Sequence, residues 1–341
     1  MGKRERKISK FTGHWITEQG AGTVEYVIVV LVAIVIGSGL LAFGNQVSGQ
    51  VTKTGNSISS WFSKANGTGG TGGGNAGGEG GGTGGATIEE LKEKDPADWT
   101  LDDQKAVAED IGKKGNSSEL YAKAKAAMDA GTEWSITLTD GNTLTYRIIG
   151  INHDDLVDGS GKAGLTFLTT STGIQSRMNA VANNDGGWES SELRQKMNTG
   201  EIWNLMPAEL QTKVKPVIKL TNNIGGGSDN VHAAVTDTTD KLFLLSYSEI
   251  VERPYSGWSS NSWLASEGTQ YEVFKGKVTN TERPGAGNKG NNSAISIGDY
   301  WWERSVAPYN YNSFFIVNDS GNPSDGAFAA YSLVVCPAFC F

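Results

Sequence analysis

The chain has 341 residues, a length that can hold two domains, but 46 of them are glycine and only 19% are charged, so part of it is not globular. Lys and Arg number 29 against 37 Asp and Glu, a formal net charge of −8, and basic residues cluster only within the first ten positions. We therefore exclude nucleic acid as a partner, because phosphate binding requires clustered Lys and Arg.

An apolar run follows the basic N-terminal segment. Residues 27–43 are apolar apart from Gly and Ser. As a helix, residues 24–43 would be about 30 Å long at about 1.5 Å per residue, which matches the hydrocarbon core of a bilayer. The basic flank would remain in the cytoplasm. The pattern predicts one transmembrane helix with the following residues exported, although an ordinary signal-anchor helix has the same pattern.

Glu25 lies at the start of this apolar run, where an unpaired carboxylate is costly. The string from Gly20 and Ala21 to Glu25 and Tyr26 resembles the processing site of Flp/Tad-type type IV pilins, in which a glycine is followed by four residues and then Glu-Tyr. The resemblance covers residues 18–62. It implies that a prepilin peptidase cleaves after the glycine and that the glutamate pairs with the terminal amine of a neighbouring subunit in the pilus.

The order of segments follows from this resemblance and from composition. Residues 1–20 would be the leader, and residues 21–64 resemble a complete pilin helix. Glycine dominates residues 65–86, which predicts a flexible linker with a span of roughly 25 Å. Residues 87–132 are expected to form helices, either as a packed prelude or as a stalk. The expected cap residues are Thr87, Thr100, Ser117 or Ser118, and Gly131.

Alternating apolar and polar residues begin at Trp134. Two such runs joined by residues 140–142 predict a β-hairpin, and residues 165–170 predict a further strand. The acidic turn between them, which includes Asp154, superficially suggests calcium, but Leu156 occupies a position where an EF-hand needs a ligand. We therefore predict a solvated turn and no metal site.

Two amphipathic helices are predicted within residues 188–223. Ser190 or Ser191 would cap the first helix and Pro207 would open the second. Residues 241–251 are strand-like in composition.

The sequence offers few ingredients for catalysis. Its three histidines stand at positions 14, 153 and 232, and no residues are arranged as in a zinc site or a Ser/His/Asp set. Cys336 and Cys340 would lie about 13 Å apart in an extended strand, too far for a disulfide. We expect buried thiols, no enzyme activity and no cofactor, and the cysteines leave the redox compartment open.

Four motifs in the C-terminal part follow one another in the order found in a bacterial domain of uncharacterised function. The motifs lie at residues 188–194, 240–246, 301–305 and 337–339. That domain is frequent in surface and phage-associated proteins, and it resembles the C-type lectin-like, formylglycine-generating-enzyme-like superfamily. The resemblance covers residues 133–341. The sequence departs from the pattern at Glu303, where an apolar residue is usual, and at Cys336.

The resemblance completes the expected fold class. It is α+β: a single transmembrane pilin helix, a glycine-rich linker, a small helical segment and a C-type lectin-like domain over residues 133–341. Oxidase relatives of this fold use a C-terminal cysteine pair, but the spacing and apolar setting of Cys336 and Cys340 argue against a copper-dependent oxidation.

The superfamily includes the variable targets of diversity-generating retroelements, whose surface positions near the C-terminus are rewritten. The resemblance implies a ligand surface, and Tyr and Asn side chains suit such a surface because they combine contact area with adaptable hydrogen bonds. The candidate ligand-binding residues are Tyr309, Asn310, Tyr311, Asn312, Phe314, Asn318, Asn322, Ser324 and Tyr331. A run of polar hairpin loops without a ligand accounts for the same composition.

Three further residues in this region are expected to be scaffold. Trp301 and Trp302 would point to opposite faces of a strand. Arg304 would pair with an internal carboxylate such as Glu192 or Asp240.

These observations predict a minor, adhesive pilin of a Tad-type pilus. It would start in the cytoplasmic membrane and end on the extracellular pilus or cell surface. Its expected partners are the prepilin peptidase, other pilin subunits, the membrane, and an unknown protein or glycan ligand. The alternative is a structural pilin or membrane-anchored surface protein whose large domain only decorates the fibre.

Overall fold

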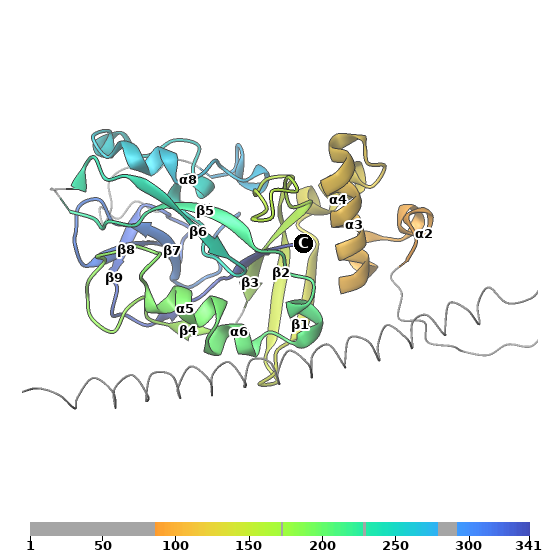
Figure 1. The fold of residues 1–341 in the computed structure, drawn as a ribbon, viewed down its shortest axis with the longest axis horizontal. Helices are drawn as coiled ribbons and strands as arrows, with labels where there is room; N and C mark the ends of the chain where they lie inside the picture. The colour runs from red at the N-terminus through yellow and green to blue at the C-terminus, as the bar shows by residue number, and fades with distance from the viewer. Residues whose placement is uncertain (1–85, 172, 228–229, 279–291) are drawn as a thin grey trace, which may run out of the picture. The chain divides into compact units, whose positions relative to one another are not determined.

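The computed structural model describes residues 86–341 except 172, 228–229 and 279–291 (Figure 1). No helix among these residues is long and apolar enough to cross a membrane. This finding contradicts the transmembrane part of the predicted fold class, and the mixed helix and strand content of the described domain agrees with the α+β part. The predicted pilin helix and the processing residues Gly20, Ala21, Glu25 and Tyr26 lie outside the described residues.

In the part of the chain that the structure describes, three α-helices precede the first strand: α2 (Ile88–Glu93), α3 (Leu101–Lys114) and α4 (Tyr121–Ala130). Thr87 and Thr100 form capping boxes at the starts of α2 and α3, as predicted, and Gly131 ends α4 with a φ of 68°. Helix α3 packs closely on the following sheet, because a Cβ on Gly164 would lie 1.9 Å from the carbonyl oxygen of Ala108. These helices therefore share the core of the strands beside them (Figure 1).

The first sheet is antiparallel and joins the beginning and the end of the domain. Its strands, in spatial order, are β1 (Glu133–Thr137), β2 (Thr143–Ile151), β3 (Leu165–Ser171) and β11 (Ala338–Cys340). The predicted hairpin is confirmed, with Gly141 at a φ of 89° in the turn between β1 and β2. Strand β11 pairs with β3, placing Phe339 opposite Phe167. The C-terminal strand thus completes a sheet that begins at residue 133.

The predicted ligand residues lie on the second sheet and on the loops that connect its strands, with only Phe314 on a strand. Its spatial order is β4 (Gln175–Ser176), β10 (Leu333–Val334), β7 (Trp301–Val306), β8 (Ser313–Val317) and β9 (Asp325–Phe328). Trp301 and Trp302 of β7 are both buried, and their indole nitrogens donate to the carbonyls of Ile295 and Ser176. The scaffold prediction for this tryptophan pair is confirmed.

The third sheet is a hairpin that the sequence interpretation missed. Its strands are β5 (Val217–Asn222) and β6 (Val235–Asp240). Residues 217–222 lie within the segment for which the sequence predicts helices. Burial alternates along β5, but the apolar Ile218 and Leu220 are exposed while Lys219 and Thr221 are buried, so the sequence lacks the apolar and polar alternation that predicts a strand.

Short helices fill the connections between the sheets: α5 (Glu192–Asn198), α6 (Glu201–Leu205), α7 (Ala208–Gln211) and α8 (Tyr247–Ile250). Ser191 caps α5 as predicted, but three short helices replace the two expected there. The strand predicted over residues 241–251 is wrong, because residues 241–246 contain only an isolated bridge from Phe243 to Ala338 and residues 247–250 form α8. Ser246 and Glu249 form a reciprocal capping box that starts α8, and this local hydrogen bonding favours a helical turn. The described residues also form short 3₁₀ helices: η1 (Pro96–Asp98), η2 (Gly115–Ser117), η4 (Ser256–Trp258), η5 (Ser262–Ser266) and η6 (Glu272–Phe274).

Candidate functional site

A buried ionic network lies between the second and third sheets. Arg304 is fully buried, and its guanidinium bonds both carboxylate oxygens of Glu249, at 2.5 and 3.0 Å. The predicted partners Glu192 and Asp240 are wrong, since Asp240 pairs with Arg194 at 2.6 Å and Glu192 lies near Arg177. The backbone explains this choice, because the amide of Arg304 donates to the carbonyl of Leu245 and holds β7 against the residues that directly precede α8.

Lys219 extends the network toward the turn after β2. Its ammonium lies 2.6 Å from Asp154 and 2.5 Å from Glu249. The prediction of a solvated turn is wrong for Asp154, which is 4% exposed and also accepts hydrogen bonds from Thr166 and Tyr271. Although burial opposes ionisation, the charge of Lys219 holds the pKa of Asp154 well below its ordinary value. Each of these charges has a partner, which is the arrangement expected of scaffold.

Two carboxyl groups beside this network are less well compensated. Glu267 accepts hydrogen bonds from the amide of Asn222 and the hydroxyl of Ser305, yet burial raises its pKa to about 7. Glu303 is fully buried, and neither of its carboxylate oxygens has a hydrogen-bond partner among the described residues. Burial, with a contribution from the neighbouring Glu267, raises the pKa of Glu303 well above its ordinary value. Burial therefore favours the neutral form of this carboxyl, at a position where the resemblance leads us to expect an apolar residue.

The nine predicted ligand residues separate into three groups by exposure. Tyr309, Tyr311 and Tyr331 are 47%, 69% and 53% exposed and can contact a ligand directly. The half-buried group is Asn310, Asn312 and Asn318. The buried group is Phe314, Asn322 and Ser324. The structure places the buried group beneath the surface, where these residues support it.

Asparagine side chains and carbonyls shape the loops of this surface. Asn184 donates to the carbonyls of Asn310 and Ser313, at 2.8 Å in each case, and so fixes the connection between β7 and β8. The side-chain oxygen of Asn318 accepts from the amides of Ser320 and Asn322 and closes the turn between β8 and β9. The predicted residue Asn318 and the unpredicted Asn184 thus bond the backbone through their side chains, which is the usual role of asparagine in turns.

An apolar groove of about 340 Å³ lies at the β9 edge of the second sheet. Of the three exposed tyrosines that were predicted to bind a ligand, Tyr331 lines this groove. It is lined by Tyr300, Ile316, Asp325, Gly326, Ala327, Phe328, Tyr331 and Leu333. The rings of Phe328 and Tyr331 meet edge to face, with centroids 5.3 Å apart. Tyr300 and Phe328, 39% and 40% exposed, were not among the predicted ligand residues. Their position next to a strand end could have identified them in the sequence, because Tyr300 directly precedes β7 and Phe328 is the last residue of β9.

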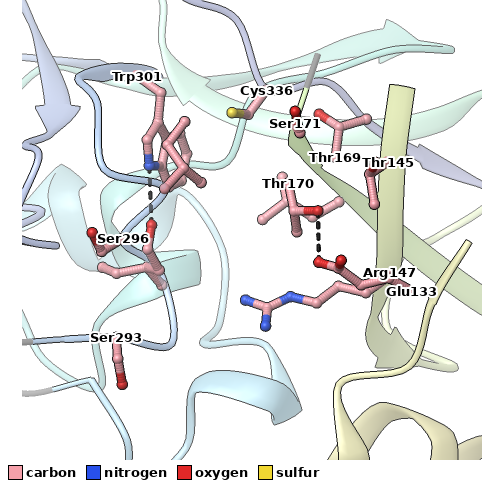
Figure 2. A pocket seen from close by; sticks show the side chains of 13 residues that line it. Glu133, Thr145, Arg147, Thr169, Thr170, Ser171, Ser293, Ser296, Trp301 and Cys336 are labelled. Atoms are coloured by element: carbon pink, nitrogen blue, oxygen red, sulfur yellow. Dashed lines mark hydrogen bonds between the residues drawn. The ribbon is translucent and has the colours of Figure 1, made fainter. Parts of the chain in front are cut away.

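A second, more polar pocket of about 350 Å³ lies between the first and second sheets (Figure 2). Its lining residues come from distant parts of the chain: Glu133, Thr145, Arg147, Leu168, Thr169, Thr170, Ser171, Ser293, Ile295, Ser296, Ile297, Trp301 and Cys336. Register shifts between β2 and β3 accompany this part of the sheet, where Thr170 bonds the carboxylate of Glu133 at 2.7 Å. None of these residues was predicted to bind a ligand.

The two cysteines are unpaired and buried, as expected. Burial raises the pKa of both thiols, so neither is a thiolate at neutral pH. Among the residues that the structure describes, no group of three or more His, Cys, Asp or Glu side chains is placed to hold a metal ion.

Comparison with known proteins gives one family. Residues 163–341, more than half of the chain, match the model of a domain of unknown function, DUF6273. No curated protein and no solved structure matches the chain. The resemblances to pilins, to the C-type lectin-like fold and to retroelement targets stay predictions. The matched segment begins just before β3 and includes the second and third sheets and all of the ionic network except Asp154, and the chain belongs to the DUF6273 family.

Proposed function

We propose that the described domain binds a ligand without catalysis and that a pilin-type N-terminal segment displays it at the surface of a bacterial cell. The observation that carries the binding proposal is the aromatic groove at the β9 edge. Tyr300, Phe328 and Tyr331 remain between 39% and 53% exposed there, although most aromatic residues of the domain are buried. Exposed aromatic groups on strands mark recognition surfaces, because little entropy is lost when a rigid ring is covered.

A protein ligand fits this groove better than a glycan. Asp325 contributes the one charged side chain to the lining, and the other lining side chains are apolar or aromatic. Sugar hydroxyls would leave most of their hydrogen bonds unmade against such a surface, whereas an apolar side chain of a protein would fill it. Tyr309 and Tyr311, on the loop between β7 and β8, add exposed contact area on the same sheet.

Two observations support binding without catalysis. The thiols of Cys336 and Cys340, the residues that an oxidase of this fold would use, are buried and protonated. The buried carboxylates Asp154 and Glu249 are ion-paired and hydrogen-bonded, so they have no free basic oxygen to offer a substrate. An ion network of this kind positions strands and helices and leaves binding to the surface.

Display at the surface rests on the sequence around Gly20 and Glu25, which resembles a prepilin processing site. Many copies on one fibre would raise the effective concentration of the domain, so that weak single contacts add up to firm attachment. The protein recovered from native cells should then begin at Ala21. A chain that still begins at Met1 would reject processing and leave the binding proposal standing.

Two measurements test the groove. The first is attachment of single cells that display the domain, and the second is binding of the domain to the ligand protein after that protein has been isolated. Changing Phe328 and Tyr331 to Ala should reduce attachment about tenfold or more, because exposed aromatic anchors carry a large share of binding energy. Leu220→Ala is the matched control, since Leu220 is 43% exposed on a different sheet. Unchanged attachment of the double variant, or attachment lost only when glycans are removed from the target, would reject the proposed protein ligand.

A further inference from the structure

Arg147 projects into the polar pocket from the middle of the first sheet. It lies on β2, opposite Glu133 of β1 and Leu168 of β3. Its Nη2 donates to the carbonyl of Ala294, on the segment that closes the other side of the pocket. In Figure 2 the guanidinium extends from the sheet toward the segment that carries Ser293 and Ser296. The arginine therefore crosses the pocket and bridges its walls.

The charge of Arg147 is poorly compensated. Its Nε is buried and has no hydrogen-bond partner among the described residues. No carboxylate of the described residues lies within ion-pair distance of its guanidinium, and the nearby Glu133 is hydrogen-bonded to Thr170. Burial lowers the pKa of Arg147, and the charge of Glu133 only partly opposes this effect. Arg147 is half-buried, and its guanidinium has only a neutral carbonyl as a direct partner. A charge in this position is destabilising, and an anion brought by a ligand would remove that cost.

We infer that this pocket binds a small organic carboxylate whose neighbouring group is a hydroxyl or an ammonium. This inference stands apart from the proposed function, because the pocket and the aromatic groove share no lining residue. The guanidinium edge that contains the free Nε matches a planar carboxylate with two parallel hydrogen bonds. The pocket thus provides the cation of an ion pair, the guanidinium of Arg147, and enough space for the carboxylate of a ligand.

The surroundings of Arg147 restrict the class of ligand. Glu133 stands across the strand pair, so a doubly charged phosphate would be repelled, whereas a hydroxyl or ammonium next to the carboxylate would find an acceptor. The exposed hydroxyls of Ser171 and Ser293 lie at the rim. Leu168 and Ile297 give the pocket apolar wall area for a short carbon chain.

The full chain is tested with four probes: acetate, L-alanine, glucuronate and inorganic phosphate. Saturable binding is measured by calorimetry and by the rise in melting temperature that a ligand of the folded state produces. L-Alanine or glucuronate should bind more tightly than acetate, and phosphate should bind least. Tighter binding of alanine would identify an amino acid or peptide terminus as the source of the carboxylate, and tighter binding of glucuronate would identify an acidic sugar.

Two variants separate a ligand site from a structural arginine. Arg147→Lys keeps the charge but loses the bidentate edge, so affinity for the best probe should fall about tenfold or more. Arg147→Met should abolish binding, and without ligand it should melt at the same temperature as the wild type or higher, because it removes a half-buried charge that has no ion-pair partner among the described residues. Arg253→Gln changes an exposed arginine and should alter neither property.

The inference has clear failures. Absence of saturable binding by all four probes would overturn it, and so would phosphate binding more tightly than the carboxylates. A ligand-free Arg147→Met protein that melts well below the wild type would show that Arg147 is a structural bridge to Ala294. None of these results bears on adhesion through the groove, so the two proposals fail separately.

Discussion

Two arginines of this domain lie on sheets and differ in what surrounds them. Every nitrogen of the Arg304 guanidinium has an acceptor, and Glu249 supplies the opposite charge. Arg147 has one carbonyl and a buried, unbonded Nε. Arg304 is the more deeply buried of the two, so burial alone does not mark a binding site. A charged side chain that lacks a partner and lies next to a cavity does mark a binding site, because a ligand can supply the missing partner.

The largest loss of stability is expected at Arg304, whose charge is fully paired in the folded protein. Arg304→Met should lower the free energy of unfolding by about 3 kcal/mol or more, because it leaves Glu249 buried with only Lys219 as a charged partner. Chemical denaturation of the full chain measures this loss. Arg147→Met, measured in parallel without ligand, should show no such loss. Equal losses in the two variants would remove the distinction between the two arginines.

Glu303 tests whether an acidic side chain without a buried partner also destabilises the domain. A carboxyl whose pKa is raised on folding binds more protons in the folded state, so the free energy of unfolding falls as pH rises above the unfolded pKa. Glu267 contributes such a fall between about pH 4.5 and about pH 7, and the fall due to Glu303 extends to higher pH.

Replacement of Glu303 by Leu should therefore stabilise the domain at neutral pH by on the order of 1–3 kcal/mol and flatten the decline in melting temperature. The measurement is the melting temperature from pH 5 to pH 8 for both proteins. Glu252→Leu, at a position with a 73% exposed side chain, is the control. A variant at position 303 with an unchanged pH profile would show that the carboxyl is compensated in the folded protein.

Arg194 provides an intermediate case. It pairs with Asp240 at 2.6 Å while remaining partly exposed, and Asp240 also accepts from Trp188 and Thr238. Arg194→Met should cost about 1–2 kcal/mol, since the buried carboxylate keeps its neutral donors. Denaturation midpoints would rank the three arginine variants, and a loss as large as that of Arg304→Met would show that hydrogen bonds do not substitute for the charge.

The smallest effect is expected at the surface. Lys125 and Asp129 form an exposed pair on α4 at 2.6 Å. Lys125→Ala should leave the melting temperature unchanged within error, because solvent screens such pairs and alanine is a good helix former. A clear loss of stability would mean that the pair contributes more than its exposure suggests.

The elements that sequence predicted well are those defined by neighbouring residues. The capping boxes at Thr87 and Thr100 and the turn at Gly141 depend on short spacings that can be recognised directly. The partners of Arg304 and Asp154 depend on contacts between residues 55 and 65 positions away. Composition could predict that these charges have partners but could not identify them.

The candidate sites were also predicted only in part. The exposed tyrosines were found because Tyr and Asn are typical of recognition loops, but sequence could not separate exposed Tyr309 from buried Phe314. The pocket of Arg147 was missed completely. Its walls come from β1, β2, β3 and the segment before β7, and no local pattern joins Glu133 to Ser293.

The pairing of β11 with β3 also determines when the domain can fold. Phe339 lies opposite Phe167, about 170 positions earlier in the chain, and Phe341 is 1% exposed in the same core. During synthesis the first hairpin emerges long before its last neighbour, so one edge of β3 stays open until the final residues arrive. An open edge invites pairing with other chains. Folding should therefore be slow and should finish only after the whole domain has been made, which gives chaperones a long interval in which to hold it.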